Sequence, residues 1–154
     1  MKKVLAFAAL AGLIAMPAAA QGTGLTAKQT EVMKQLLSTY ETKAKEQAQD
    51  KKSKSGPYKA FTAESGREFY LKRRTWQLTD PTCSGCHTED PKKEGKHIET
   101  KKPIKPLAPV ANADRFVNIE KVEKNFADHC QDLLERDCYA NEKGSYIAYM
   151  MSVK

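Results

Sequence analysis

The sequence predicts an all-α domain. Apolar residues recur at intervals of three and four positions near both ends of the chain and over residues 122–133, which is the spacing of one helix face. Residues that favour helix N-caps precede two of these segments. No segment alternates apolar and polar residues as a half-buried strand does, and the sequence contains no internal repeat.

A long helix is expected near the N-terminus, starting after Thr26, because threonine is a good N-cap residue. This helix is expected to end in a charged stretch before Ser55-Gly56-Pro57, which breaks regular structure. A shorter helix is expected over 63–73. The apolar face of the first helix is formed by Val32, Met33, Leu36, Leu37, Tyr40 and Ala44.

Residues 89–113 are expected to form a long loop, because the segment contains four prolines and cannot continue as a helix. A loop of this length is unusual in a compact domain unless it has a further surface to wrap around. The four prolines are Pro91, Pro103, Pro106 and Pro109.

The third helix has the strongest local signals. Asn118 is a good N-cap residue, and Glu120 lies in the first turn, where the helix dipole favours a carboxylate. Val117 and Val122 occupy the positions of a hydrophobic staple. One face of this helix is formed by Val122, Phe126, His129 and Leu133.

A last helix is expected to start at Asn141 and to run toward the C-terminus. Its apolar stripe contains Tyr146, Ile147, Met150 and Met151. Methionines at such positions usually fill a core.

Residues 1–20 have the pattern of a secretory signal peptide. Lys2 and Lys3 form a basic start, residues 4–16 are apolar, and the small residues after them suit a cleavage site after Ala20. The apolar run is too short to span a membrane. We therefore expect export and one mature domain over 21–154, with no stable membrane insertion after cleavage. An uncleaved N-terminal anchor is the alternative.

The formal net charge of +7 falls to +5 when Lys2 and Lys3 are removed with the leader. Much of the positive charge lies over 43–54, where solvation of a helix end and linker is a sufficient explanation. A basic face would also steer the protein toward an acidic partner. Nucleic acid is not an expected partner, because no recognition motif or interleaved aromatic residues accompany the charge.

The run Cys83-Ser84-Gly85-Cys86-His87 is the attachment signal for a c-type haem. Its two thiols add to the two haem vinyl groups, and the histidine that comes next binds the iron as proximal ligand. A redox-active cysteine pair and half of a zinc site are the alternatives. The first would need a βαβ context that the sequence lacks, and the second would need another closely spaced cysteine pair.

The opposite axial position of the iron has three kinds of candidate. Methionine is common there, but Met33, Met150 and Met151 all lie on predicted core faces. His97 lies in a lysine-rich loop and is expected to be a solvated surface residue. His129 lies on the apolar face of the third helix, where it is either a satisfied core histidine or an iron ligand.

Cys130 and Cys138 remain once the haem has taken two thiols. In an oxidising compartment two remaining cysteines are expected to pair. Such a bridge would contribute about 2–4 kcal/mol to stability. It would also restrict the movement of the adjacent His129.

Several short motifs lie after the C-x-x-C-H run: Gly95-Lys96, Ile104-Lys105-Pro106-Leu107-Ala108-Pro109, Arg115-Phe116, Lys121-Val122-Glu123-Lys124, His129-Cys130, Asp137-Cys138, Glu142-Lys143 and Ile147-Ala148-Tyr149. Together they resemble the family of cytochrome c'' (c double-prime) and the sphaeroides haem protein, monohaem c-type cytochromes. The motifs cover about half of the chain, within a family-like core of about 63–152. The N-terminal helix and its charged linker precede that core and are similar only in pattern.

The resemblance implies a class I cytochrome c-like helical fold around one covalently bound haem. It implies His129 as the distal iron ligand, since the residue before the first bridge cysteine is that ligand in cytochrome c'' and an asparagine in the sphaeroides protein. It also implies a Cys130–Cys138 disulfide and release of the distal ligand on reduction. A freed imidazole ordinarily titrates near pH ~6.5, so electron uptake would be coupled to proton uptake. The haem propionates are a second candidate proton site, tuned by loop residues such as Lys96 and Lys105.

The resemblance leaves two functional classes. The first is a periplasmic electron carrier, which transforms no substrate and is therefore not an enzyme, with an unidentified redox protein as partner. The second is a haem protein that binds or processes NO, O₂ or CO at the ferrous iron. The sequence shows no distal acid–base pair typical of a peroxidase.

Overall fold

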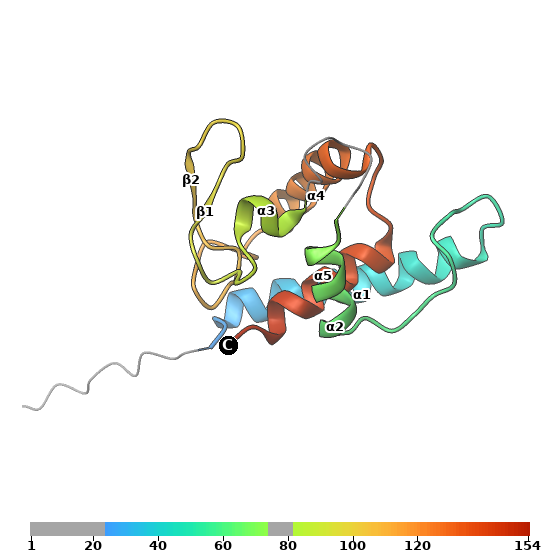
Figure 1. Ribbon diagram of the computed structural model, residues 1–154. Helices are drawn as coiled ribbons and strands as arrows, with labels where there is room; N and C mark the ends of the chain where they lie inside the picture. The colour runs from blue at the N-terminus through green and yellow to red at the C-terminus, as the bar shows by residue number, and fades with distance from the viewer. Residues whose placement is uncertain (1–23, 74–81) are drawn as a thin grey trace, which may run out of the picture.

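The computed structural model describes residues 24–73 and 82–154. The predicted leader and cleavage site lie outside these ranges. Within them the chain forms five helices and one antiparallel pair of very short strands, shown in Figure 1. In chain order the elements are α1 (Ala27–Gln49), α2 (Ala63–Leu71), α3 (Cys83–His87), β1 (Gly95–Lys96), β2 (Pro103–Ile104), α4 (Ile119–Leu134) and α5 (Ala140–Ser152). The all-α prediction is confirmed.

The core forms where α5 packs against both α1 and α2. Figure 1 shows α1, α2 and α5 grouped on one side of the molecule, away from β1, β2 and α4. The crossing of α2 and α5 is close, because a Cβ at Gly66 would overlap the backbone of Ser145 and the side chain of Tyr149. The largest fully buried apolar side chains are Met33, Leu36, Tyr40, Tyr70, Ile147 and Met150.

The predicted helix starts agree closely with the structure. Thr26 caps α1 and forms a capping box with Gln29. Asn118 caps α4 by accepting a hydrogen bond from the Lys121 backbone N–H at 2.8 Å. The last helix begins one residue earlier than expected, and α2 ends at Leu71 rather than at residue 73.

The prolines predicted a long irregular loop over 89–113, but part of this region forms regular structure. Gly95 pairs with Ile104, and Lys96 with Pro103, so the segment 95–104 forms a small hairpin. Strands of two residues are too short to show any alternating pattern, so no sequence signal marked them.

The remainder of this region is fixed to α1 by one buried side chain. Gln29 donates hydrogen bonds from Nε2 to the carbonyl oxygens of Pro109, Asn112 and Arg115 at 3.0, 3.2 and 3.1 Å. These carbonyls lie some eighty residues away in sequence, and their pairing satisfies loop backbone that would otherwise be buried without partners. This part of the loop therefore has a defined course beside α1.

Figure 1 shows the backbone of α4 set away from α1, α2 and α5, although its side chains Val122, Phe126 and Cys130 belong to the core. Among the described elements, the backbones of α1 and α2 pack closely against α5, and no element packs as closely against the backbone of α4. Its buried residues are Val122, Phe126 and Cys130.

Across residues 24–73 and 82–154, no helix is long and apolar enough to span a membrane.

Candidate haem site

The cysteine motif forms the short helix α3. The Oγ1 of Thr82 caps it by accepting a hydrogen bond from the backbone N–H of Gly85 at 2.7 Å. Cys83 and Cys86 are half-buried and line a cavity of about 580 Å³. Gly95 lets the 95–104 hairpin pack closely against α3, because a Cβ at this position would overlap the backbone of Cys86 and His87. The cap by Thr82 and the close packing of Gly95 therefore fix the backbone of the cysteine motif beside the cavity.

His87 lies on the wall of this cavity and is 9% exposed. The Tyr70 hydroxyl donates to the carbonyl oxygens of His87 and Thr88, at 3.2 and 2.5 Å. This contact ties the C-terminal end of α3 to α2. Burial lowers the pKa of His87 to about 4, and the nearby His129 and Arg115 contribute to that shift. Its imidazole is therefore neutral at pH 7, as a metal ligand must be.

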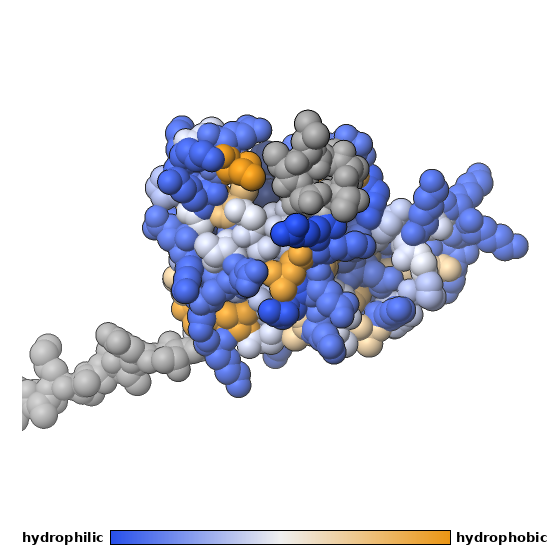
Figure 2. Space-filling model, in the orientation of Figure 1, coloured by the Kyte–Doolittle hydropathy of each residue, from blue (hydrophilic) through white to orange (hydrophobic). Residues whose placement is uncertain are grey.

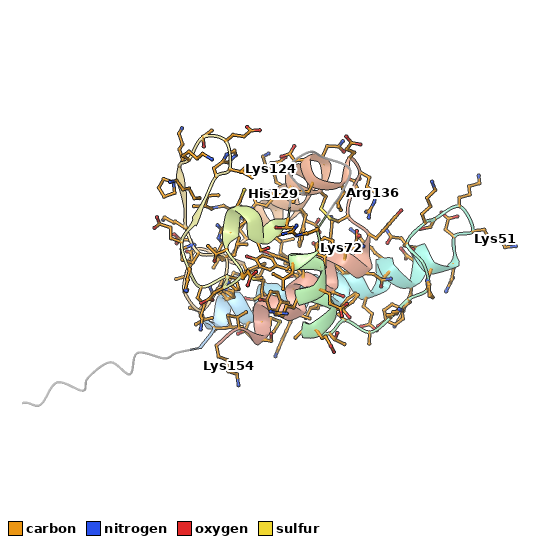
Figure 3. All side chains as sticks on the ribbon, viewed as in Figure 1. Lys51, Lys72, Lys124, His129, Arg136 and Lys154 are labelled. Carbon is orange, nitrogen blue, oxygen red and sulfur yellow. A yellow bond between two sulfur atoms is a disulfide. The ribbon has the colours of Figure 1, made fainter. Side chains whose placement is uncertain are left out.

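His129 is exposed on α4 and lines the same cavity. Its Nδ1 lies 2.9 Å from the carbonyl oxygen of Asn125. A carbonyl only accepts, so Nδ1 carries the proton and Nε2 is left with a lone pair for a metal. Figure 3 shows His129 on the side of α4 that is nearest to α3.

The two imidazoles lie opposite one another. Their ring centroids are 6.3 Å apart, with an angle of 34° between the ring planes. A metal–imidazole bond of about 2.0–2.1 Å, added to a ring radius of about 1.1 Å on each side, gives about 6.3 Å for two rings on one metal. The observed spacing therefore suits one iron between His87 and His129.

The cavity has the size and lining expected of a haem pocket. Its volume lies within the range of about 300–1,000 Å³ that is typical of cofactor sites. Its apolar walls come from α2, the loop before α4, α4 and α5, and include Phe69, Leu107, Phe116, Val122, Phe126 and Tyr146. The residues present thus fit a haem held by two thioether bonds and two imidazoles.

Cys130 and Cys138 form a disulfide, with their Cα atoms 5.5 Å apart. The bridge starts at the residue after His129 and joins the end of α4 to the segment before α5. Arg136, inside the bridged loop, makes a two-fold ion pair with Glu142 of α5 at 2.9 and 2.8 Å. The loop between the two cysteines is therefore held by the disulfide and by the ion pair between Arg136 and Glu142.

Three polar residues differ from the sequence-based expectation. His97 is half-buried on the hairpin and lines the cavity, rather than being fully solvated. Its Nδ1 accepts hydrogen bonds from the Glu99 and Thr100 backbone N–H groups, both at 3.2 Å. Lys96 and Lys105 are exposed and do not line the cavity.

Among the described residues, the Lys and Arg side chains that line the cavity are those of Arg115 and Lys121. Arg115 is fixed in place, because its guanidinium donates to the carbonyl oxygens of Lys105 and Pro106. Lys96 and Lys105 lie outside this lining. The Arg115-Phe116 motif and the Lys121-Val122-Glu123-Lys124 motif were the only signs of Arg115 and Lys121 in the sequence.

The methionines considered as ligands lie elsewhere. Met33 and Met150 are fully buried in the α1–α5 core. Met151 packs against the same core and does not line the cavity. Among the described residues no group of three or more His, Cys, Asp or Glu side chains could hold a metal ion.

Comparison with known proteins places the chain in a family. Residues 57–150 match a family model described as a domain of unknown function, DUF1924. The chain is 41% identical to cytochrome c'' of Methylophilus methylotrophus over 96 residues, which are 62% of this chain and 67% of that protein. It is 38% identical to the cytochrome c-type protein SHP of Cereibacter sphaeroides over 89 residues, 57% of this chain and 68% of that protein.

Solved structures agree with these matches. The crystal structure of oxidised cytochrome c'' superposes with a TM-score of 0.68 at 33% identity, covering 80% of this chain and 96% of the other. Oxidised SHP, described as an oxygen-binding cytochrome c, gives 0.62 at 34% identity over 77% and 94%. A solution structure of cytochrome c'', concerned with detachment of a haem ligand, gives 0.66 at 34% identity over 80% and 94%.

The fold and site define the class of monohaem c-type cytochromes, whose cofactor is a covalently attached haem c. Within that class, the chain belongs to the family of cytochrome c'' and SHP.

Proposed function

We propose that this chain is a periplasmic electron carrier whose ferric iron is bound by two histidines. Cys83 and Cys86 would attach the haem, and His87 and His129 would bind the iron from opposite sides. The facing of the two imidazoles at 6.3 Å is the observation that carries the proposal. The bound haem supplies a one-electron couple. We expect the chain to transform no substrate and therefore to be no enzyme.

The protein holds the imidazole of His87 more firmly than that of His129. His87 is buried, and its backbone is fixed by Tyr70. His129 depends on α4, whose backbone makes fewer contacts with the core helices than they make with one another. Of the two ligands, His129 is therefore the one that can move away with its helix.

We further propose that His129 leaves the iron on reduction and then takes up a proton. Ferrous iron carries one positive charge fewer than ferric iron, so it attracts an imidazole less strongly. A released imidazole ordinarily titrates near neutral pH. The propionates are a second candidate proton site, beside Arg115 and Lys121. Cytochrome c'', whose haem ligand detaches, supports this proposal by similarity.

Binding of a diatomic gas is the alternative function. The related SHP is an oxygen-binding cytochrome c. Release of His129 would open one face of the iron toward the cavity, where NO, O₂ or CO could enter. The two functions use the same residues and differ in whether the vacated iron position then binds a gas.

The compartment and the partner are also proposals. The leader pattern at residues 1–20 and the Cys130–Cys138 disulfide both favour an oxidising compartment, the periplasm. The 92–105 segment exposes six lysines: Lys92, Lys93, Lys96, Lys101, Lys102 and Lys105. It also carries Ile98, which is 45% exposed and lines the cavity. In Figure 2 hydrophobic atoms lie among hydrophilic ones at this end of the molecule. Such a surface suits an acidic redox protein.

Absorption spectra of the holoprotein in both oxidation states test this function. We expect low-spin ferric iron and high-spin, five-coordinate ferrous iron, with a midpoint potential that falls as pH rises because reduction takes up a proton. A ferrous state that stays low-spin and binds no CO would contradict the release of His129 and leave a plain electron carrier. Tight, specific O₂ or NO binding at physiological concentration would favour the gas-binding alternative.

A further inference from the structure

Helix α4 carries the distal histidine but has little backbone contact with the other helices. At its C-terminal end it is fixed by the Cys130–Cys138 disulfide. A single covalent link acts as a pivot, because it fixes one point of a helix and leaves its direction open. The direction of α4 must therefore be set by contacts nearer its N-terminus.

Glu123, in that half of α4, makes polar contacts with both α1 and α5. Glu123 accepts a hydrogen bond from the Tyr40 hydroxyl of α1 at 2.9 Å. Its second carboxylate oxygen accepts from Lys143 Nζ of α5 at 3.0 Å. Glu123 therefore ties three helices together, and it lies seven residues, or about 10 Å along the helix, before the pivot at Cys130.

The surroundings of this triad strengthen it. Tyr40 is 1% exposed, and the side chains of Lys143 and Glu123 are 18% and 33% exposed. Lys143 Nζ lies 5.4 Å from the Phe126 ring centroid and 5.7 Å from that of Tyr40. Because water is largely displaced, the pair is less screened than an ion pair on the surface.

Phe126 connects this triad to the haem site. Its ring packs edge-on against Tyr40, at 6.1 Å between centroids, and against Tyr146, at 5.5 Å. It lies three residues before His129, so the two side chains share one face of α4. Glu123 and Lys143 themselves do not line the cavity.

We infer that Glu123, held by Tyr40 and Lys143, is a positioning residue that sets the strength of the bond between His129 and ferric iron. The triad directs α4 toward the iron, and the disulfide fixes its far end. The inference rests on the proposed function, since it requires His129 to be the ligand.

Replacing Glu123 tests it on the holoprotein, well below the unfolding temperature. Glu123→Ala is expected to raise the ferric high-spin fraction at least threefold. If the ferric bond weakens tenfold, the midpoint potential rises by about 59 mV, because the ligand stabilises the ferric state selectively. Tyr40→Phe removes one hydrogen bond and keeps the ring, so it should shift both quantities in the same direction by less.

A rescue and a control make the test specific. The double variant Glu123→Gln with Lys143→Gln replaces the ion pair by hydrogen-bonding amides and should return the spin state to within twofold of the wild type. Lys124→Ala removes an exposed ion pair with Asp128 from the next position on the same helix, and should leave the spin state unchanged.

The outcomes separate the role of Glu123 from the ligand assignment. Glu123→Ala and Tyr40→Phe variants that lose only thermal stability, with wild-type spin state and potential, would overturn the inference. His129→Ala belongs in the same series. If ferric His129→Ala stays low-spin, the ligand assignment itself is wrong, and the proposed function fails together with the inference.

Discussion

At the scale of single residues, the availability of His129 as a ligand depends on a backbone carbonyl one turn earlier. Because Asn125 O accepts from Nδ1, the lone pair of the other ring nitrogen is left for a metal. The buried His87 is neutral because burial lowers its pKa. Two different environments thus prepare two imidazoles for one iron.

Covalent attachment of the haem is a prediction about Cys83 and Cys86. Extraction with acid and organic solvent should leave the haem on the polypeptide, because thioether bonds survive denaturation. Cys83→Ala or Cys86→Ala alone should retain it by one bond, and the double variant should release it. Mass spectrometry of the extracted chain gives the answer, and clean extraction from the wild type would contradict the attachment.

At the scale of helices and strands, predictability from sequence depended on whether the signal was local. Asn118 and the apolar stripe of α4 are local, and they placed the start of that helix correctly. Gln29 and Glu123 bind partners some eighty residues away, and no local pattern reports such pairs. The motif and the family resemblance indicated the haem site, but the role of Tyr70 and the position of His97 required the fold.

The anchoring of α4 has a consequence for acid stability. Burial alone would raise the pKa of Glu123, but the hydrogen bonds from Lys143 and Tyr40 outweigh it, so the net shift is downward. The unfolded chain then binds a proton at a higher pH than the folded one. The contribution of Glu123 is therefore fully present above its usual pKa of about 4.5 and is lost as the pH falls through the lower folded value.

Urea unfolding of the holoprotein from pH 3 to pH 7 checks this sign. The wild type should lose stability below about pH 4.5 more steeply than Glu123→Gln, which cannot titrate at this position. Lys124→Ala serves as the control and should keep the wild-type slope. Parallel pH profiles for the wild type and Glu123→Gln would show that Glu123 makes no such contribution.

The crossing of α2 and α5 allows a packing prediction. Alanine favours a helix over glycine by about 1 kcal/mol, so Gly66→Ala would stabilise an isolated α2. In the folded chain its Cβ would overlap Ser145, and overpacking costs about 1–3 kcal/mol. We expect net destabilisation in thermal unfolding, and a rise in melting temperature would show that the crossing is looser than described.

At the scale of the whole molecule, the helical core and the haem site share a wall, because Phe116, Val122 and Phe126 belong to the core and also line the cavity. The three helices α1, α2 and α5 bury one another, while α3, the hairpin and α4 surround the cavity. The sequence predicted the helical class, and the resemblance supplied the haem-centred arrangement. The pairing of β1 with β2 emerged only from the fold.

Electrostatic steering can be tested through those lysines. Lys96→Glu with Lys102→Glu should slow reduction of ferricyanide, an anionic probe, several-fold at low salt. The difference should vanish near 1 M salt, where the Debye length is about 3 Å. Lys51→Glu with Lys52→Glu makes the same charge change in the linker at the far end of α1, where Figure 3 shows Lys51, and should have a smaller effect. Equal effects would mean that only net charge matters.

Electron paramagnetic resonance of the ferric holoprotein tests the central claim most directly. With His87 and His129 on one iron, the wild type and His97→Ala should both give the low-spin signal of two imidazole ligands. His129→Ala should give a high-spin signal, because one axial ligand is lost. A low-spin signal that survives His129→Ala, or a high-spin signal in the wild type, would contradict the assignment of His129 as the distal ligand.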